Sequence, residues 1–82
     1  NNINCMTEED ILKIACTNSY RAIILKEDWL EIFQEDNNYF AHNPVRNLVE
    51  IEVVNTLLFY FNEIEDYEKC IKIRDYIKAR EN

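Results

Sequence analysis

The sequence contains no glycine, a single proline and a single histidine. Glycine and proline mark most tight turns, so their scarcity argues against a turn-rich β architecture and favours helices. The absence of glycine also excludes the glycine-rich loops that cradle phosphates in nucleotide-binding proteins. We therefore expect a helical chain without a phosphate-binding loop of that kind.

Long apolar runs are missing too. No run of about 18 uninterrupted apolar residues occurs, and Leu57–Phe61 is too short to cross a bilayer, so no membrane insertion is expected. The three cysteines are an odd number without C-x-x-C spacing, and no apolar signal region opens the sequence. These features favour a cytoplasmic protein with free thiols. Three cysteines and His42 could supply four zinc ligands by number, but their spacing gives no support, so neither metal nor cofactor is expected.

Basic residues are scarce relative to acidic ones, which leaves a net charge of −7. Binding to a phosphate backbone needs basic patches, so direct nucleic-acid binding is not expected. Docking on anionic lipid is disfavoured for the same reason. An acidic surface is compatible with a basic protein partner.

At 82 residues the chain has room for one domain, 1–82, and it shows no internal repeat. The expected fold class is all-α, a small helical bundle of about four helices. Its last part, 44–81, is expected to be an antiparallel helical hairpin. A chain this short buries a small fraction of its surface and is marginally stable alone.

Capping signals and apolar spacing predict the hairpin. Asn43 and Pro44 are expected to open its first helix as N-cap and first helical residue. The acidic segment Glu63–Asp66 is expected to join the helices, with Asp66 capping the second. A connection this short makes the helices antiparallel. Residues at helical spacing are Val45, Leu48, Val49, Leu57, Phe61 and Ile64 in the first helix, and Tyr67, Cys70, Ile71, Arg74 and Ile77 in the second.

The run from Asp66 to Lys78 resembles the UVR motif of the UvrB and UvrC repair proteins. That motif pairs a helix with an acidic-aromatic-Glu turn, two small residues and then aliphatic-Arg-Asp-x-Ile. The matching positions are Tyr67 for the aromatic, Arg74 and Asp75 for the Arg-Asp pair, and Ile77 for the last aliphatic. Cys70 and Ile71 stand where the family has two alanines, which would hold the helices further apart. The motif is a protein–protein contact in that family, so the resemblance implies a binding role.

The N-terminal half is expected to hold shorter helices. Thr7 is a capping residue with acids in the following turn, and the helix it opens is expected to end near Cys16. Thr17–Ser19 is expected to be a non-helical break between this helix and the next element. Tyr20–Gln34 is expected to be helical with a bend near Lys26–Asp28, although the composition of its first residues also suits a buried strand. The loop that follows carries two aromatic residues and His42.

The first hairpin helix is apolar around nearly its whole circumference, and such a helix must be buried on every side. Either the other helices cover it, or the remainder is an exposed apolar patch that marks an interface. The partner-binding candidates are therefore aromatic, apolar or loop residues of this surface: Trp29, Phe33, Tyr39, Phe40, His42, Leu58, Phe59, Phe61, Tyr67 and Arg74.

Catalytic chemistry is not expected. Ser19 and the cysteines are the candidate nucleophiles, but nothing in the sequence brings His42 near any of them. The carboxylates at the hairpin turn are better explained as a solvated acidic turn than as an acid–base pair or a metal site. For His42 the simplest interpretation is a loop histidine that packs on Tyr39 or Phe40, and the functional one is a partner contact.

The sequence thus favours a non-catalytic protein-interaction module that acts by helix-face docking and is either monomeric or a homo-oligomer. The partner would be a basic protein or the cytoplasmic part of a membrane protein. A second hypothesis follows from composition, which is acidic, glycine-free and rich in Asn, Ile, Lys and Tyr. It is typical of small bacteriophage regulators, such as lysis-timing accessory proteins or acidic DNA mimics that inhibit host defence.

Overall fold

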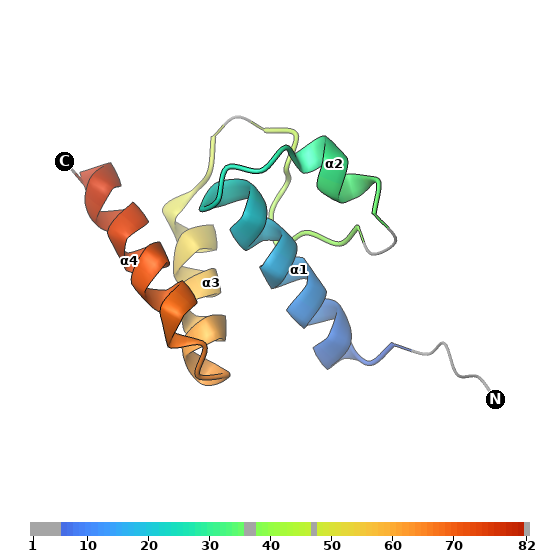
Figure 1. The fold of residues 1–82 in the computed structure, drawn as a ribbon, viewed down its shortest axis with the longest axis horizontal. Helices are drawn as coiled ribbons and strands as arrows, with labels where there is room; N and C mark the ends of the chain where they lie inside the picture. The colour runs from blue at the N-terminus through green and yellow to red at the C-terminus, as the bar shows by residue number, and fades with distance from the viewer. Residues whose placement is uncertain (1–5, 36–37, 47, 82) are drawn as a thin grey trace.

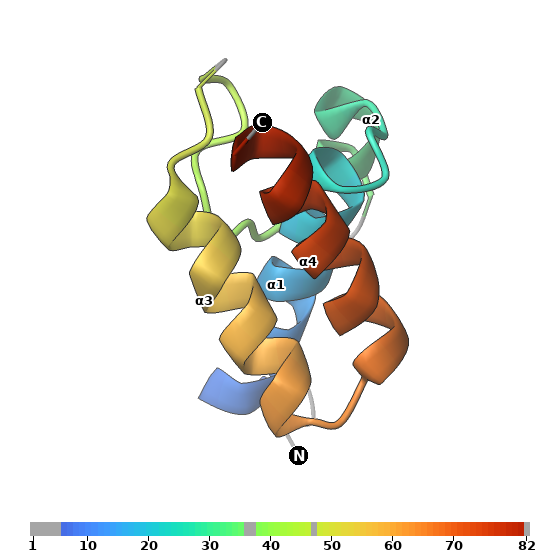
Figure 2. The ribbon, with the colours of Figure 1, turned by 90° about the vertical axis from the view of Figure 1, so that its left-hand side faces the viewer.

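A computed structural model describes residues 6–35, 38–46 and 48–81. The described residues form four helices and no strand, namely α1 (Glu8–Ile23), α2 (Trp29–Phe33), α3 (Ile51–Glu63) and α4 (Tyr67–Glu81). The all-α prediction is therefore confirmed. Helices α3 and α4 lie antiparallel, α1 packs across the pair, and α2 lies near the C-terminal end of α1 (Figures 1 and 2). Each helix of the described chain is too short or too polar to traverse a bilayer.

Helix α1 begins where the sequence predicted but runs further. The Thr7 hydroxyl accepts from the Asp10 amide at 3.1 Å, and the Asp10 carboxylate accepts from the Thr7 amide at 3.2 Å, which completes a capping box. The predicted end near Cys16 and the break at Thr17–Ser19 are wrong. The helix continues through this polar segment because tertiary partners outside the helix satisfy its side chains. Asn18 donates to the Tyr39 carbonyl oxygen, and Ser19 bonds to residues of the same loop.

A turn after Ile23 separates α1 from α2, so Tyr20–Gln34 is neither one bent helix nor a strand. Lys26 has a φ of 62°, in the left-handed region that glycine usually fills. The Arg21 guanidinium then fastens α2, because it donates to Glu27 at 2.9 Å and in bidentate fashion to Glu35 at 3.0 Å. These hydrogen bonds lower the pKa of the Glu35 carboxyl.

The predicted helix start at Asn43 and Pro44 is also wrong. The Asn43 side-chain oxygen accepts from the Val45 amide at 3.1 Å, and its carbonyl oxygen accepts from the Arg46 amide at 3.3 Å. These bonds close a turn, which is the competing preference of an Asn-Pro pair. Helix α3 begins at Ile51, and the side chain of Leu48, upstream of it, is 68% exposed.

The α3–α4 hairpin is confirmed, and its connection has a recognisable helix-ending geometry. The Asp66 amide donates to the Phe61 carbonyl oxygen, and the Glu65 amide donates to the Asn62 carbonyl oxygen. This pair of bonds is a Schellman motif, which needs a left-handed residue after the helix. Glu65 takes that place with a φ of 64° because the chain has no glycine. Asp66 accepts from the Lys69 ammonium at 2.9 Å and, at 3.5 Å, from its amide at the start of α4.

The core lies where three helices meet. Its buried members are Cys16, Tyr20 and Ile23 from α1, Val54, Leu57 and Phe61 from α3, and Cys70 and Ile73 from α4. The stripe predicted for α4 is partly wrong, because Ile73 is buried while Tyr67 and Ile71 are each 56% exposed. The buried edge of α4 is therefore Cys70, Ile73 and the half-buried Tyr76 and Ile77.

Candidate functional site

The predicted candidates fall on two separate parts of the molecule. Trp29 and Phe33 pack edge to face on α2, with ring centroids 6.2 Å apart, and Phe40 packs in the same way on His42 at 5.8 Å. Trp29 and His42 also line one hollow of about 230 Å³. Tyr39, 44% exposed, is held through its carbonyl oxygen by Asn18.

The remaining candidates lie on the hairpin and differ widely in exposure. Phe61 is 1% exposed and lies in the core, so a partner cannot reach it in the folded chain. Leu58 is half-buried against the same core. Phe59 is 67% exposed, and Tyr67 and Arg74 lie on the outer face of α4. The apolar circumference predicted for the first hairpin helix is therefore covered on most sides but open at Phe59 and Ile64.

One pairing that sequence reasoning missed joins Ser19 to His42. The Ser19 hydroxyl lies 2.7 Å from His42 Nδ1 and accepts from the Ala41 amide at 2.8 Å. Burial lowers the pKa of the His42 imidazole, which favours the neutral ring in this hydrogen bond. Ser19 is 0% exposed and no substrate can reach it. The pair therefore fastens the loop to α1. No sequence signal could have paired residues so far apart in the chain.

The described cysteines are buried. Cys16 and Cys70 are each 0% exposed, and burial raises the pKa of the Cys16 thiol, which disfavours the reactive thiolate. The interpretation of Cys70 as a small apolar core residue is confirmed. Cys5 lies outside the described residues. Within the described ranges, no three side chains among His, Cys, Asp and Glu converge as a metal ion would require.

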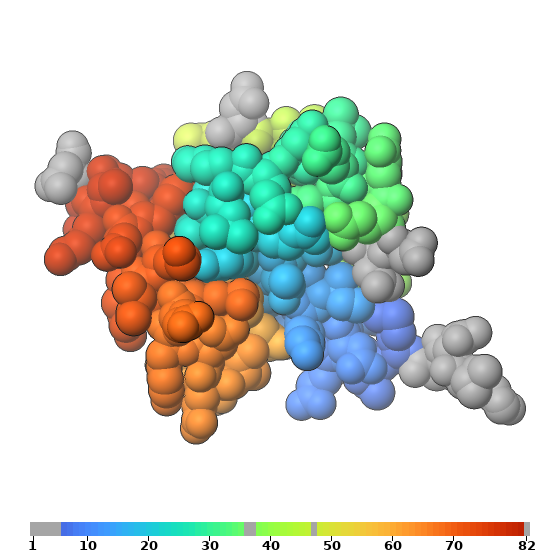
Figure 3. Space-filling view, in the orientation of Figure 1, coloured from blue at the N-terminus to red at the C-terminus, as the bar shows by residue number. Residues whose placement is uncertain are grey.

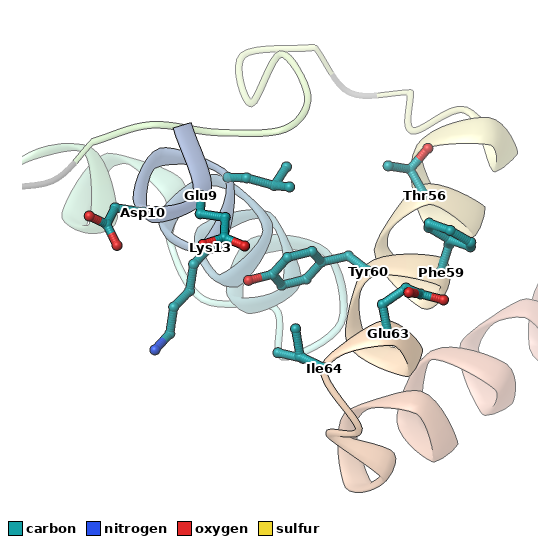
Figure 4. A pocket seen from close by; sticks show the side chains of 9 residues that line it. Glu9, Asp10, Lys13, Thr56, Phe59, Tyr60, Glu63 and Ile64 are labelled. Carbon is teal, nitrogen blue, oxygen red and sulfur yellow. The ribbon is translucent and has the colours of Figure 1, made fainter. Parts of the chain in front are cut away.

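An open groove of about 600 Å³ with apolar and acidic lining lies between α1 and α3, and it is here called the α1–α3 groove. On the α1 side it is lined by Glu9, Asp10, Leu12 and Lys13. On the other side it is lined by Thr56, Phe59, Tyr60, Glu63 and Ile64. Figure 4 shows the Tyr60 side chain reaching from α3 toward α1 between the two walls.

The groove exists because the two helices diverge. All buried residues of α1 lie from Ala15 onward, so its first two turns project beyond the core. The C-terminal part of α3 turns into α4 on the opposite side (Figure 1). The two ends stand apart in the space-filling view, with a notch between them (Figure 3). Leu12, Phe59 and Ile64 remain 47%, 67% and 47% exposed there.

Acidic groups surround this apolar floor. Three carboxylates and one ammonium line the groove, which leaves it a net negative charge. Burial raises the pKa of the Tyr60 phenol, and the nearby Cys16 and Glu9 raise it further. Glu9 lines the α1 wall of the groove, on the side toward which Tyr60 reaches (Figure 4). The groove therefore combines an exposed apolar floor with an acidic rim.

No protein-family model, curated protein or solved structure matches the chain. The likeness of Asp66–Lys78 to the UVR motif therefore stays a prediction. The structure places Cys70 of that run against α3, with its Sγ 4.0 Å from the Leu58 carbonyl oxygen. Ile71 points away from the core and is 56% exposed. Only one of the two substituted small positions therefore lies between the helices.

Proposed function

We propose that this protein is a non-catalytic interaction module that docks a protein partner in the α1–α3 groove. The observation that carries the proposal is the exposure of Leu12, Phe59 and Ile64 together in one concave surface. Larger contiguous apolar patches on soluble proteins mark interaction sites or binding grooves. Binding would cover these side chains and supply burial that a short chain lacks on its own.

Exposed apolar side chains on other helices compete with the groove. Leu30 and Phe33 on α2 are 48% and 47% exposed, and Tyr67 and Ile71 on α4 are each 56% exposed. Each of these surfaces belongs to a single helix, and the hollow beside Ile71 is lined by α4 alone, whereas the groove draws apolar side chains from two helices. Interface hot spots cluster in well-packed pockets that exclude water, which a concave surface provides more readily.

A photocrosslinking experiment tests the proposal. A photoreactive phenylalanine analogue placed at Phe59, Phe33 or Ile71 samples the groove, α2 and α4 in turn. The variants are irradiated in a lysate of cells whose genome encodes the chain. Only the variant labelled at position 59 should form a discrete crosslinked adduct. Excess unmodified chain should suppress this adduct, and excess Phe59→Ser chain should not.

Adducts from position 33 or 71, with none from position 59, would move the binding surface away from the groove. No discrete adduct from any of the three positions would remove the interaction function itself. Light scattering over a range of concentrations distinguishes a partner from self-association, because an adduct with a second copy requires a concentration-dependent mass.

A further inference from the structure

We infer that the partner of the α1–α3 groove presents a cationic amphipathic helix, an inference that rests on the proposed interaction function. The lining side chains recur at helical spacing on both walls. Glu9, Leu12 and Lys13 follow i, i+3, i+4 along α1, and Thr56, Phe59, Tyr60 and Glu63 follow i, i+3, i+4, i+7 along α3. Rows of this kind form the ridges between which a third helix packs.

The length of the groove fits a short helix. The α3 wall runs from Thr56 to Ile64, which at 1.5 Å per residue is about 12 Å. A partner helix of two to three turns spans that distance. It would place two or three apolar side chains against Leu12, Phe59 and Tyr60, in the manner of amphipathic helices that bind hydrophobic grooves.

The acidic rim of the α1–α3 groove favours a partner helix with positive charge. Glu9 and Glu63 stand on opposite walls, and both carboxylates are exposed. The Asp10 carboxylate is already engaged by the Thr7 amide, and Lys13 is the one cation that lines the groove. A helix with Lys or Arg on both sides of its apolar stripe pairs with Glu9 on one wall and Glu63 on the other. An acidic helix meets repulsion on both sides.

Other occupants fit less well. A small molecule is usually enclosed over most of its surface, whereas walls whose apolar side chains are 47–67% exposed leave it open to water. A second copy could offer α4, the one helix here with more basic than acidic residues. Its outer face also carries Glu68, Asp75 and Glu81, so its charge is mixed. A helix with a uniformly cationic rim complements the groove better.

The test titrates the full chain, observed by amide NMR, with a designed amphipathic peptide of about 14 residues, long enough for the groove and both flanks. The peptide has leucine at i, i+3, i+4 and i+7 with lysine and arginine beside the stripe. A matched peptide carries glutamate at the same flanking positions. We expect the basic peptide to shift the amides of 9–13 and 56–64, and to bind about tenfold or more tightly than the acidic one.

Charge reversal in the chain supplies the second readout. Glu9→Lys with Glu63→Lys should weaken the basic peptide about tenfold and favour the acidic one. Glu31→Lys with Glu68→Lys makes the same change in net charge outside the groove and should leave affinity within about twofold. Phe59→Ser should abolish binding of either peptide, while Ile71→Ser should not.

Four results would overturn the inference. The first is equal binding of both peptides, and the second is equal weakening by the two pairs of reversals. The third is no shift at peptide concentrations of about 1 mM, a level at which weak complexes are populated. A concentration-dependent dimer that protects the groove amides would instead assign the site to a second copy. These outcomes leave the photocrosslinking result standing, so loss of the helix inference is distinguishable from loss of the interaction function.

Discussion

Phe59 and Phe61 lie two residues apart on α3, and the structure predicts opposite responses to the same substitution. Phe61 is 1% exposed, and its ring meets Tyr20 edge to face at 5.6 Å and Tyr60 at 5.1 Å. The Lys69 ammonium lies 5.7 Å from its centroid. Phe59 is 67% exposed. The pair therefore separates a core residue from a surface residue on one helix.

Phe61→Ala should lower the free energy of unfolding by about 3–5 kcal/mol, through lost burial and the cavity left behind. The two aromatic contacts place it in the upper part of that range, since each adds about 0.5–1.5 kcal/mol. Phe59→Ala should change the unfolding free energy by no more than about 0.5 kcal/mol. A chain of this size has a total stability of about 4–12 kcal/mol, so at the lower end of that range the first variant would be close to unfolding.

Urea unfolding followed by circular dichroism and by Trp29 fluorescence measures both values. If Phe61→Ala is too unstable to yield a transition, Phe61→Leu should still fold and lose about 1–2 kcal/mol. A loss below about 1 kcal/mol for Phe61→Ala would refute the assignment of Phe61 to the core. A loss above about 2 kcal/mol for Phe59→Ala would show that Phe59 is structural and would remove it from the binding surface.

Four further predictions concern the loop, the first cap and the hairpin turn. The pKa of His42 is lowered in the folded chain, so the unfolded state binds more protons below about pH 6.5. The free energy of unfolding should therefore fall as the pH drops through that value. Urea midpoints of His42→Gln should lose this pH dependence, and an unchanged slope would remove His42 as its source. Ser19→Ala leaves the His42 ring and a loop amide without their partner and should cost about 1–3 kcal/mol by urea unfolding, against almost nothing if the contact is incidental. Thr7→Ala removes the α1 cap and should cost about 0.5–2 kcal/mol with faster amide exchange in the first turn, whereas unchanged exchange would contradict the capping box. Glu65→Gly should raise the thermal midpoint and add about 0.5–1 kcal/mol, because glycine tolerates a φ of 64°, and a loss of stability would show that the glutamate side chain contributes there.

Local signals in the sequence determined the helix ends that depend on neighbouring residues alone. Thr7 opened α1 as expected because a capping box closes within four residues. The hairpin turn fell at the acidic segment Glu63–Asp66, as expected. No proline or glycine lies nearby that would make a stronger break. The all-α class followed from composition, because the chain has no glycine and a single proline.

Tertiary contacts explain the two places where the predicted helix ends were wrong. Thr17–Ser19 looked like a break because these polar residues bond to the backbone in turns, yet Asn18 and Ser19 bond to the loop instead, and α1 continues. Asn43 and Pro44 suit a helix start and a turn equally well by local preference, and they form a turn in the loop that Asn18 and Ser19 hold against α1.

The α1–α3 groove depends on tertiary structure more than any other feature. Helical periodicity could show that α3 is apolar around its circumference, but not which side the other helices would leave open. That side was decided by the angle between two helices, which leaves Leu12 on one wall and Phe59 on the other. An angle between helices is set by the fit of side chains across the contact, a long-range property that no local stretch of sequence encodes.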